Sequence, residues 1–366
     1  MLILSIISFG IVQAFSKHQP LKQDKVTIVT SFYPMYIIAL NLTEHMDNVE
    51  VVNLTDNNVG CLHDYQLTTK DMRTLNDADV LILNGGDMEL FLEDVVTMYP
   101  SLEVIDASEH ISLLEGIEHV HGEEAHSEEI HTEDFHGADS HIEDVHTEDS
   151  HADENVEMES HDSSTEDAHA EEDSVKIEDN QISSEDSHNH EGHVHSDING
   201  HVWLDMNRYL VQIETIANAL SKYDMDNADL YLKNANIYMD KLSKLKDEFE
   251  ETFSKVAGLE IVGFHGAFAY LADELSFDMI YSLDMDSDTV LSAGEIATVI
   301  EEVKQHKVKY LLAEDQYSKD IAKRIAEETN ANVYLLETLV SGELNKDAYL
   351  IGMQKNLATL KNMLFQ

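Results

Sequence analysis

The sequence is poor in cysteine and in basic residues. Cys61 is the single cysteine among 366 residues, which excludes a disulfide framework and a zinc site built from cysteines. Lysine and arginine together number 22 against 73 aspartates and glutamates, giving a formal net charge of -51. Nucleic acid and anionic membrane surfaces repel so acidic a chain. The composition therefore indicates a protein that attracts cations.

Apolar runs long enough to span a membrane are also lacking. The run at residues 2–12 (LILSIISFGIV) is too short to cross a bilayer comfortably. Small residues at Val12 and Ala14 fit a cleavage position after Ala14, so residues 1–24 are predicted to be a leader and the protein to be exported, periplasmic or associated with the cell surface. An uncleaved anchor is the alternative. No cysteine follows the run closely, so a lipid anchor is not supported.

Histidine, in contrast, is concentrated in one acidic tract. A histidine recurs every five residues, and five of the six spacers between them carry two carboxylates. The regular series is His121, His126, His131, His136, His141, His146 and His151, followed by His161, His169, His188, His190, His193 and His195. A period of five matches neither a helix nor a strand, so no single face is built.

The tract predicts weak, auxiliary metal binding by a disordered segment. Few large apolar residues occur in it, so residues 117–198 are expected to be disordered. Between residues 119 and 199, 27 acidic residues stand against Lys176 alone, which accounts for about half of the net charge. Imidazole and carboxylate both bind metal ions, and the histidines from His121 to His151 with His188, His190, His193 and His195 are the candidates. A merely solvated acidic linker is the alternative.

Strands and helices alternate on both sides of the tract. In the first part, strands are predicted at 25–30, 51–54, 79–83 and 102–106, with helices at 35–42, 68–75 and 88–98. In the second part, strands are predicted at 259–264, 279–283, 308–313 and 332–336, with helices at 206–221, 266–275, 293–306, 318–329 and 346–364. This alternation predicts an α/β fold with two lobes, each a parallel sheet covered by helices on both faces.

One long helix is predicted to join the two lobes. Residues 226–257 keep mostly helical apolar spacing and contain no glycine or proline until Gly258. The predicted organisation is a leader at 1–24, an N-terminal lobe at 25–225 with the insertion 117–198, a connecting helix at 226–258 and a C-terminal lobe at 259–366. A coiled-coil arm is the alternative use of the helix, but its apolar heptad pattern is irregular.

Four candidate metal ligands are placed where such lobes bind ligands, outside the carboxyl ends of their strands. His63 lies in the loop after strand 51–54, His265 directly follows strand 259–264, and Glu337 directly follows strand 332–336. His201 opens the segment after the tract. Three imidazoles and one carboxylate complete a tetrahedral zinc shell. Taken singly, each histidine is more often structural or exposed, and Cys61 is a less favoured further ligand.

Several motifs resemble the zinc-binding solute-capture proteins of ATP-driven importers. They are Leu62-His63-Asp64-Tyr65, His201-Val202-Trp203-Leu204-Asp205, His265-Gly266-Ala267-Phe268-Ala269-Tyr270, Leu312-Ala313-Glu314-Asp315-Gln316 and Leu335-Leu336-Glu337-Thr338-Leu339. The resemblance covers residues 25–110 and 199–366, and it implies a metal held in a cleft between two α/β lobes. Glu337-Thr338 stands where the family usually has Asp-Pro, so Glu314 is the second candidate for the carboxylate ligand.

The resemblance implies zinc capture and delivery rather than catalysis. Manganese binders of the wider family tend to carry Glu where this chain has His265, and imidazole suits Zn²⁺ better. The expected protein is a monomeric, high-affinity Zn²⁺ carrier that docks on an ABC-type membrane permease. A carrier of manganese or another divalent metal, and a zinc store or sensor centred on the tract, are the alternatives. A zinc hydrolase is less favoured, because the chain has no His-Glu-x-x-His helix and four protein ligands leave no open position.

Overall fold

The computed structural model describes residues 25–55, 62, 65–116, 198–283, 291–316 and 318–365. The predictions made for the leader, for Cys61 and His63, and for the histidine-rich tract lie outside these residues. Within the described part of the chain, no helix is both long and apolar enough to cross a membrane.

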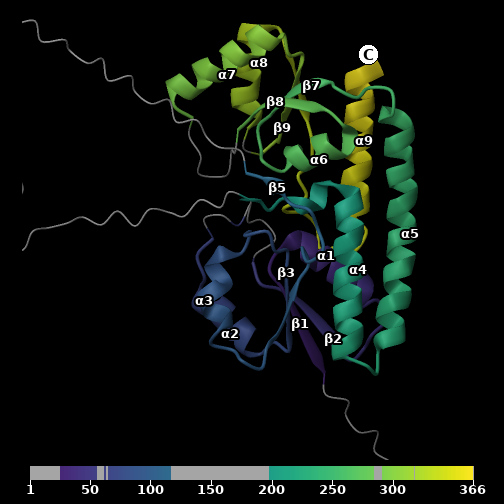
Figure 1. The fold of residues 1–366 in the computed structure, drawn as a ribbon. Helices are drawn as coiled ribbons and strands as arrows, with labels where there is room; N and C mark the ends of the chain where they lie inside the picture. The colour runs from purple at the N-terminus through teal and green to yellow at the C-terminus, as the bar shows by residue number, and fades with distance from the viewer. Residues whose placement is uncertain are drawn as a thin grey trace, which may run out of the picture. The chain divides into compact units, whose positions relative to one another are not determined.

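The N-terminal lobe is built on a four-stranded parallel sheet in the order β2-β1-β3-β4 (Figure 1). Its strands are β1 (Val26–Thr30), β2 (Val49–Asn53), β3 (Val80–Leu83) and β4 (Glu103–Asp106). The two central strands β1 and β3 carry side chains that are fully buried on both faces, among them Ile28, Val29 and Leu81. Continuous apolar runs of this kind are typical of parallel strands covered by helices on both sides.

The helices of this lobe follow local capping signals. In α1 (Tyr33–Leu42), Pro34 occupies the first turn, where its missing N–H costs nothing. At the start of α2 (Thr69–Asn76), Thr68 and Asp71 form a reciprocal capping box. The prediction of one helix over 88–98 is wrong in extent. The chain forms the 3₁₀ turn η1 (Leu90–Leu92) and the four-residue helix α3 (Glu93–Val96), none of whose residues is buried, so packing does not favour a longer helix there.

The C-terminal lobe repeats the arrangement. Its parallel strands are β7 (Glu260–Gly263), β8 (Asp278–Ser282), β9 (Tyr310–Ala313) and β10 (Asn332–Leu335), in the order β10-β9-β7-β8. Its helices are α6 (Phe268–Leu275), α7 (Ala293–His306), α8 (Lys319–Thr329) and α9 (Ala348–Phe365). When the strands of each sheet are numbered within their own lobe, both orders read 2-1-3-4. The prediction of two parallel-sheet α/β lobes is thus confirmed.

Two long helices, α4 (Met206–Tyr223) and α5 (Ala228–Phe253), lie between the sheets in the sequence. With 26 residues, α5 is about 39 Å long. It packs along α4 and α1 and also against α6 and α9, so it contacts helices of both lobes (Figure 1). The buried face of α5 consists of residues at helical spacing: Tyr231, Ala235, Tyr238, Leu242, Leu245, Phe249 and Phe253.

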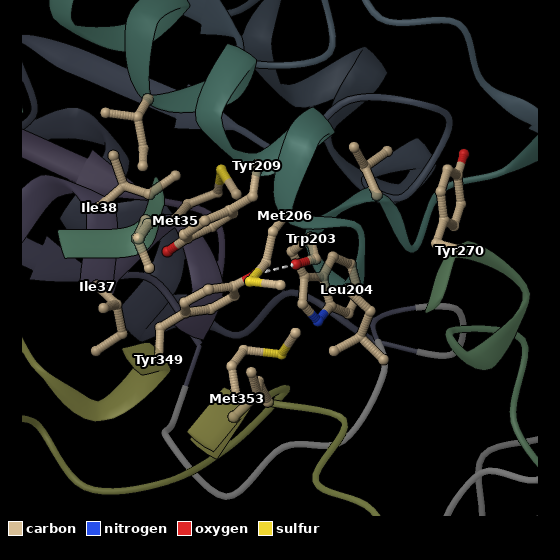
Figure 2. Close-up of a cluster of buried hydrophobic side chains, with 14 of the residues drawn as sticks. Met35, Ile37, Ile38, Trp203, Leu204, Met206, Tyr209, Tyr270, Tyr349 and Met353 are labelled. Carbon is tan, nitrogen blue, oxygen red and sulfur yellow. Dashed lines mark hydrogen bonds between the residues drawn. The ribbon is translucent and has the colours of Figure 1, made fainter. Parts of the chain in front are cut away.

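A continuous core of aromatic and apolar side chains joins α1, α4 and α9 (Figure 2). The rings of Tyr209 and Tyr349 stack with centroids 3.8 Å apart. The Tyr349 hydroxyl donates a hydrogen bond of 2.6 Å to the carbonyl oxygen of Trp203. Since Trp203 lies two residues after a candidate ligand, this core fixes the backbone that carries His201.

A short antiparallel pair closes the insertion. Strand β5 (Leu114–Glu115) pairs with β6 (Ile198–Asn199), with Leu114 opposite Asn199. These strands are not among those predicted from the sequence, and Ile198 belongs to β6 rather than to the predicted disordered segment. The chain therefore leaves and re-enters the N-terminal lobe at neighbouring positions.

Candidate metal centre

Two of the predicted histidines meet in the interior. His201 follows β6 and precedes the 3₁₀ turn η2 (Val202–Leu204), and His265 directly follows β7. Both residues are buried: His201 is 2% exposed and His265 is 1% exposed. Their ring centroids lie 4.9 Å apart with an interplanar angle of 78°. Residues 64 positions apart in the chain thus present two imidazoles to each other.

Glu314 is the carboxylate that lies beside them. It directly follows β9, and its Oε1 is 3.6 Å from Nε2 of His265. Because β7 and β9 are neighbours at the point where the strand order reverses, the residues after them meet at one edge of the sheet. The turn is held by Ser318, whose Oγ accepts a hydrogen bond of 2.8 Å from the Glu314 N–H. Glu314 is 5% exposed, so this carboxylate lies in a largely water-excluded position.

Glu337 occupies a different position. It follows β10, which is separated from β7 by β9, so it lies about two strand spacings, roughly 10 Å, along the sheet edge. The Glu337 side chain is 50% exposed and pairs with Nζ of Lys355 at 3.1 Å. Glu314 and Glu337 both line one cavity of about 350 Å³, together with Thr338 and Lys355. The structure therefore brings Glu314 to His265 and turns Glu337 toward Lys355.

Hydrogen bonds fix the orientation of both rings. Nδ1 of His201 is 2.8 Å from Oδ1 of Asn199. Nδ1 of His265 lies 3.0 Å from the backbone N–H of Ala267, which can only donate. In the neutral ring, His265 therefore carries its proton on Nε2, the atom that faces Glu314. Each imidazole is thus oriented by a partner within two residues in the sequence.

Aromatic side chains enclose the imidazoles. The ring of Trp203, the single tryptophan of the sequence, lies 5.3 Å from that of His201 and 5.1 Å from that of Phe32, centroid to centroid. Its indole N–H donates to the carbonyl oxygen of Thr338 at 2.7 Å. The His201 turn is therefore tied to the loop after β10. Because apolar walls exclude water, charge interactions with a bound cation are strengthened.

A buried polar network in the N-terminal lobe, not predicted from the sequence, supports the same turn. Asn84 follows β3 and donates from Nδ2 to the carbonyl oxygen of Gly200 at 2.8 Å. The Glu89 carboxylate accepts from the Ser31 hydroxyl at 2.6 Å and from the backbone N–H groups of Asn84 and Gly85 at 2.8 and 3.1 Å. Burial raises the pKa of Glu89 to about 7, and these three hydrogen bonds oppose the shift. Asn84-Gly85-Gly86 directly follows a predicted strand, but its buried partner Glu89 carries no sequence signal.

The described residues alone do not complete a metal shell. Among them, no group of three or more His, Cys, Asp or Glu side chains converges closely enough to hold a metal ion. His63 lies outside the described residues, as do the tract histidines His121, His126, His131, His136, His141, His146, His151, His188, His190, His193 and His195. Two imidazoles and a carboxylate are a donor set that suits Zn²⁺, and a shell around them requires at least one further ligand.

Comparisons of the sequence with known proteins agree in pointing to zinc-binding relatives. The zinc-binding protein AdcA of Streptococcus pyogenes serotype M3 is 27% identical over 368 residues, covering 99% of this chain and 60% of the relative. The chain thus spans about 60% of the length of that streptococcal protein. The high-affinity zinc uptake system protein ZnuA of Bacillus subtilis is 27% identical over 358 residues, covering 94% of this chain and 89% of the relative.

Solved structures share the fold. The solute-binding protein FpvC of Pseudomonas aeruginosa, in complex with Ni²⁺, superposes with a TM-score of 0.65 at 19% identity, covering 92% of this chain and 96% of its own. Zn(II)-bound AdcA of Streptococcus pneumoniae superposes with a TM-score of 0.63 at 22% identity, covering 93% of this chain and 58% of its own.

A family model decides the relationship. The model described as zinc-uptake complex component A, periplasmic, matches residues 28–363, which include both sheets, His201, His265 and Glu314. This match extends over nearly the whole chain, and the two-lobed α/β fold agrees with it. The protein belongs to the family of the periplasmic component A of zinc-uptake complexes.

Proposed function

We propose that this protein captures Zn²⁺ outside the cytoplasm and delivers it to the membrane permease of an ABC-type importer. The observation that carries the proposal is that the buried His265 lies beside both the His201 ring, 4.9 Å between centroids, and the Glu314 carboxylate, 3.6 Å from its Nε2. The names of the zinc-binding relatives support the cargo, and the family supports the assembly with an uptake complex. The ion is cargo, so the site must both hold it and release it.

The proposed shell consists of His63, His201, His265 and Glu314. Three imidazoles and one carboxylate complete a tetrahedral zinc site, with Zn–N distances of about 2.0–2.1 Å. Glu314 replaces Glu337 as the favoured carboxylate because its oxygen already lies 3.6 Å from Nε2 of His265. To bind zinc through Nε2, the neutral His265 ring must carry its proton on Nδ1, so the hydrogen bond from the Ala267 N–H to Nδ1 has to be given up when the ion binds. The Glu314 carboxylate, 3.6 Å from Nε2, would then bind the same ion.

The donor set favours Zn²⁺ over Mn²⁺. Imidazole suits zinc, whereas carboxylate and water suit manganese. The same fold carries Ni²⁺ and Mn²⁺ in the FpvC complexes of Pseudomonas aeruginosa, so the fold alone does not choose the metal. With two buried imidazoles beside one carboxylate, selection rests on the ligands.

The experiment that tests the site compares Glu314, whose loss should weaken zinc binding, with Glu337, whose loss should not. Zinc is titrated in competition with a chelator, and fluorescence of Trp203 reports the cleft specifically, because this single tryptophan contacts the His201 ring. His201→Ala, His265→Ala and Glu314→Gln should each weaken tight binding by more than the roughly 10–100-fold that loss of an outer hydrogen-bond partner costs. Glu337→Gln is the matched control and should leave the affinity nearly unchanged.

Other outcomes would change the assignment. If Glu337→Gln weakens binding and Glu314→Gln does not, the two carboxylates exchange roles. If neither histidine variant loses affinity, the cleft is not the zinc site and the proposed function fails. The proposal also expects no catalysis, so the zinc-loaded protein is assayed for esterase and peptidase turnover. Turnover that depends on His265 would support a hydrolase instead.

A further inference from the structure

Asn199 touches both imidazole-bearing turns. It is the last residue of β6 and is 6% exposed. Its Nδ2 donates to the carbonyl oxygen of Gly266 at 2.9 Å, one residue after His265. Its Oδ1 accepts from the backbone N–H of His201 at 3.0 Å and lies 2.8 Å from Nδ1 of the same ring. One amide side chain therefore bridges the turn of the N-terminal lobe and the turn of the C-terminal lobe.

The contacts decide which way the amide points. The Gly266 carbonyl oxygen can only accept, so it must face the NH₂ group of Asn199. The oxygen of the amide then faces His201, where a backbone N–H already donates to it. In a flipped amide, Oδ1 would face the Gly266 carbonyl oxygen, which is also an acceptor, and Nδ2 would face the His201 backbone N–H, which is also a donor. The orientation is therefore determined by chemistry from both sides.

The amide orientation in turn determines the proton on His201. An amide oxygen accepts and cannot donate, so Nδ1 of His201 must carry the proton in the 2.8 Å contact. The neutral ring then has its lone pair on Nε2, the atom a metal requires. Histidine ligands are commonly oriented in this way, with the second ring nitrogen donating to an oxygen.

We propose that Asn199 is a positioning residue for zinc capture, which presents Nε2 of His201 to the ion and holds the two histidine turns in register. The inference rests on the proposed zinc function. Asn199 does not touch the ion; it acts through His201 and Gly266. Asn199 pairs with Leu114, so the residue that orients His201 lies where the insertion re-enters the fold.

The backbone of Asn199 is held as firmly as its side chain. The Tyr270 hydroxyl donates to the Asn199 carbonyl oxygen at 2.6 Å and accepts from the Leu114 N–H at 3.0 Å. The guanidinium of Arg208 lies 5.1 Å from the centroid of the Tyr270 ring and donates to the Ser112 carbonyl oxygen at 3.1 Å. Residues of α4 and α6 thus fix both strands of the short ladder.

Three variants of the full-length protein separate positioning from stability. Asn199→Ala removes both contacts and should weaken cleft binding of zinc about 10–100-fold, measured by chelator competition with Trp203 fluorescence. Asn199→Asp keeps an acceptor for Nδ1 of His201 but cannot donate to Gly266, so it should recover a large part of the affinity lost in Asn199→Ala.

Asn41→Ala is the control. Asn41 is also buried and its Nδ2 bridges two segments, donating to the carbonyl oxygens of Ile37 and Lys346 at 2.9 and 2.7 Å. It should lower thermal stability without changing zinc affinity.

A spectroscopic readout addresses the proton directly. In ¹⁵N spectra of the zinc-free protein, the signals of His201 are identified by their absence in His201→Gln. They should show the tautomer protonated on Nδ1, and Asn199→Ala should shift the population toward the tautomer protonated on Nε2. A purely structural role would leave this tautomer ratio unchanged, because the ring itself is not altered.

The outcomes distinguish this inference from the function beneath it. If His201→Ala abolishes tight binding while Asn199→Ala binds zinc as tightly as the unmodified protein, the positioning role is wrong and the proposed function stands. If Asn199→Ala, Asn199→Asp and Asn41→Ala all lose the same affinity, the effect is general destabilisation and the positioning role is again wrong. If His201→Ala itself retains tight binding, the zinc function fails first.

Discussion

At the scale of single residues, Gly200 is the position before His201 where no side chain fits. A Cβ built there would lie 2.6 Å from the backbone carbonyl oxygen of Gly86 and 3.1 Å from Cε of Met88. A backbone oxygen cannot move aside as a flexible side chain can. The Asn84 side chain, which donates to the Gly200 carbonyl, would be displaced with it. The absence of a side chain at 200 therefore sets how closely the His201 turn approaches the loop after β3.

We expect Gly200→Ala to weaken cleft binding of zinc and to lower the free energy of unfolding by about 1–3 kcal/mol, the usual cost of forcing extra atoms into a packed site. Chelator competition and denaturant titration measure the two effects. Gly294→Ala is the control, because its Cβ would meet only Ser292 Oγ at 3.7 Å and the site lies in α7. Alanine there should be neutral or stabilising. Equal effects of both substitutions would contradict the steric argument.

Glu89 provides a residue-scale prediction for pH. Burial raises its pKa from about 4.5 in the unfolded chain to about 7 in the folded protein. The folded state therefore holds the proton more tightly, and the stabilisation is present below pH 4.5 and is lost as the pH rises toward 7 and above. The contribution is about 3 kcal/mol. Over this window, the free energy of unfolding should decrease relative to that of a variant that cannot ionise.

Glu89→Gln supplies that variant. Glutamine has one carbonyl oxygen, so it can accept either from the Gly85 N–H or from Ser31 and Asn84, but not from all three. The variant should therefore be less stable than the unmodified protein at pH 4.5. Its stability should then change less between pH 4.5 and 8 than that of the unmodified protein. Burial raises the pKa of Glu274 to about 8, but that group titrates in both proteins, so only the difference between their slopes reports Glu89. Parallel slopes in urea titrations would refute the assignment.

At the scale of elements, the sequence predicts those whose signal is local. The helix over 293–306 agrees with α7 at both ends, because Ser292 and Glu295 form a capping box and Lys307 adopts a left-handed conformation after the last turn. The strands β1, β3, β9 and β10 are apolar runs and were predicted within two residues of their ends. The prediction of one helix over 88–98 failed: Asp87, just before this range, has a positive φ of 60°, and no residue of α3 is fully buried.

The ladder of β5 and β6 could not be predicted from sequence. Each strand has two residues, too few for an alternating pattern, and their partners are separated by the whole insertion. The same reason hid the role of Asn199, whose contacts at Gly266 and Tyr270 are 67 and 71 residues away. A single sequence contains no pairing information over such separations.

The choice between Glu314 and Glu337 also depended on an element-scale fact. Both residues directly follow a strand, so the rule about strand ends applies to both. Only the strand order, with β9 next to β7 and β10 beyond it, separates them. The proximity of His201 and His265 agrees with the motifs beside which each stands, whereas strand order is a property of the assembled sheet. Their role as metal ligands stays a prediction.

At the scale of the whole molecule, α5 and the shared core connect the two lobes. Contacts of α5 reach α1 and α4 on one side and α6 and α9 on the other. The Tyr33 hydroxyl donates to the Glu343 carbonyl at 2.7 Å, and Asn41 donates to that of Lys346. A wide opening between the lobes would break these partly buried hydrogen bonds. Zinc exchange is therefore expected to involve loops at the cleft rather than rotation of whole lobes.

The histidine-rich tract is tested by deletion at the same scale. Removing residues 119–195 leaves five residues between β5 and β6, a length that suits a hairpin loop. We expect the deletion to remove several weak zinc equivalents and to leave one tight site with nearly unchanged affinity. Ordering a flexible segment around each ion costs on the order of 1 kcal/mol per residue, so sites in the tract should be weak and interchangeable.

Equilibrium dialysis counts all bound zinc, and Trp203 fluorescence follows the cleft alone. A variant in which residues 119–195 are replaced by a scrambled sequence of the same length and composition is the matched control and should keep the weak equivalents. Loss of tight binding on deletion would make the tract part of the primary site. If the full-length protein binds many zinc equivalents with comparable, tight affinity, it is a zinc store rather than a carrier.

The pairing of Leu114 with Asn199 also bears on how such proteins diversify. Because these two residues are paired, the insertion between them, called here the branch, begins and ends at one point of the lobe. For a flexible loop in general, doubling the length raises the entropy cost of closure by only about 0.6 kcal/mol. A lineage can therefore lengthen, shorten or recompose the branch through ordinary insertions and deletions, each nearly invisible to selection for folding.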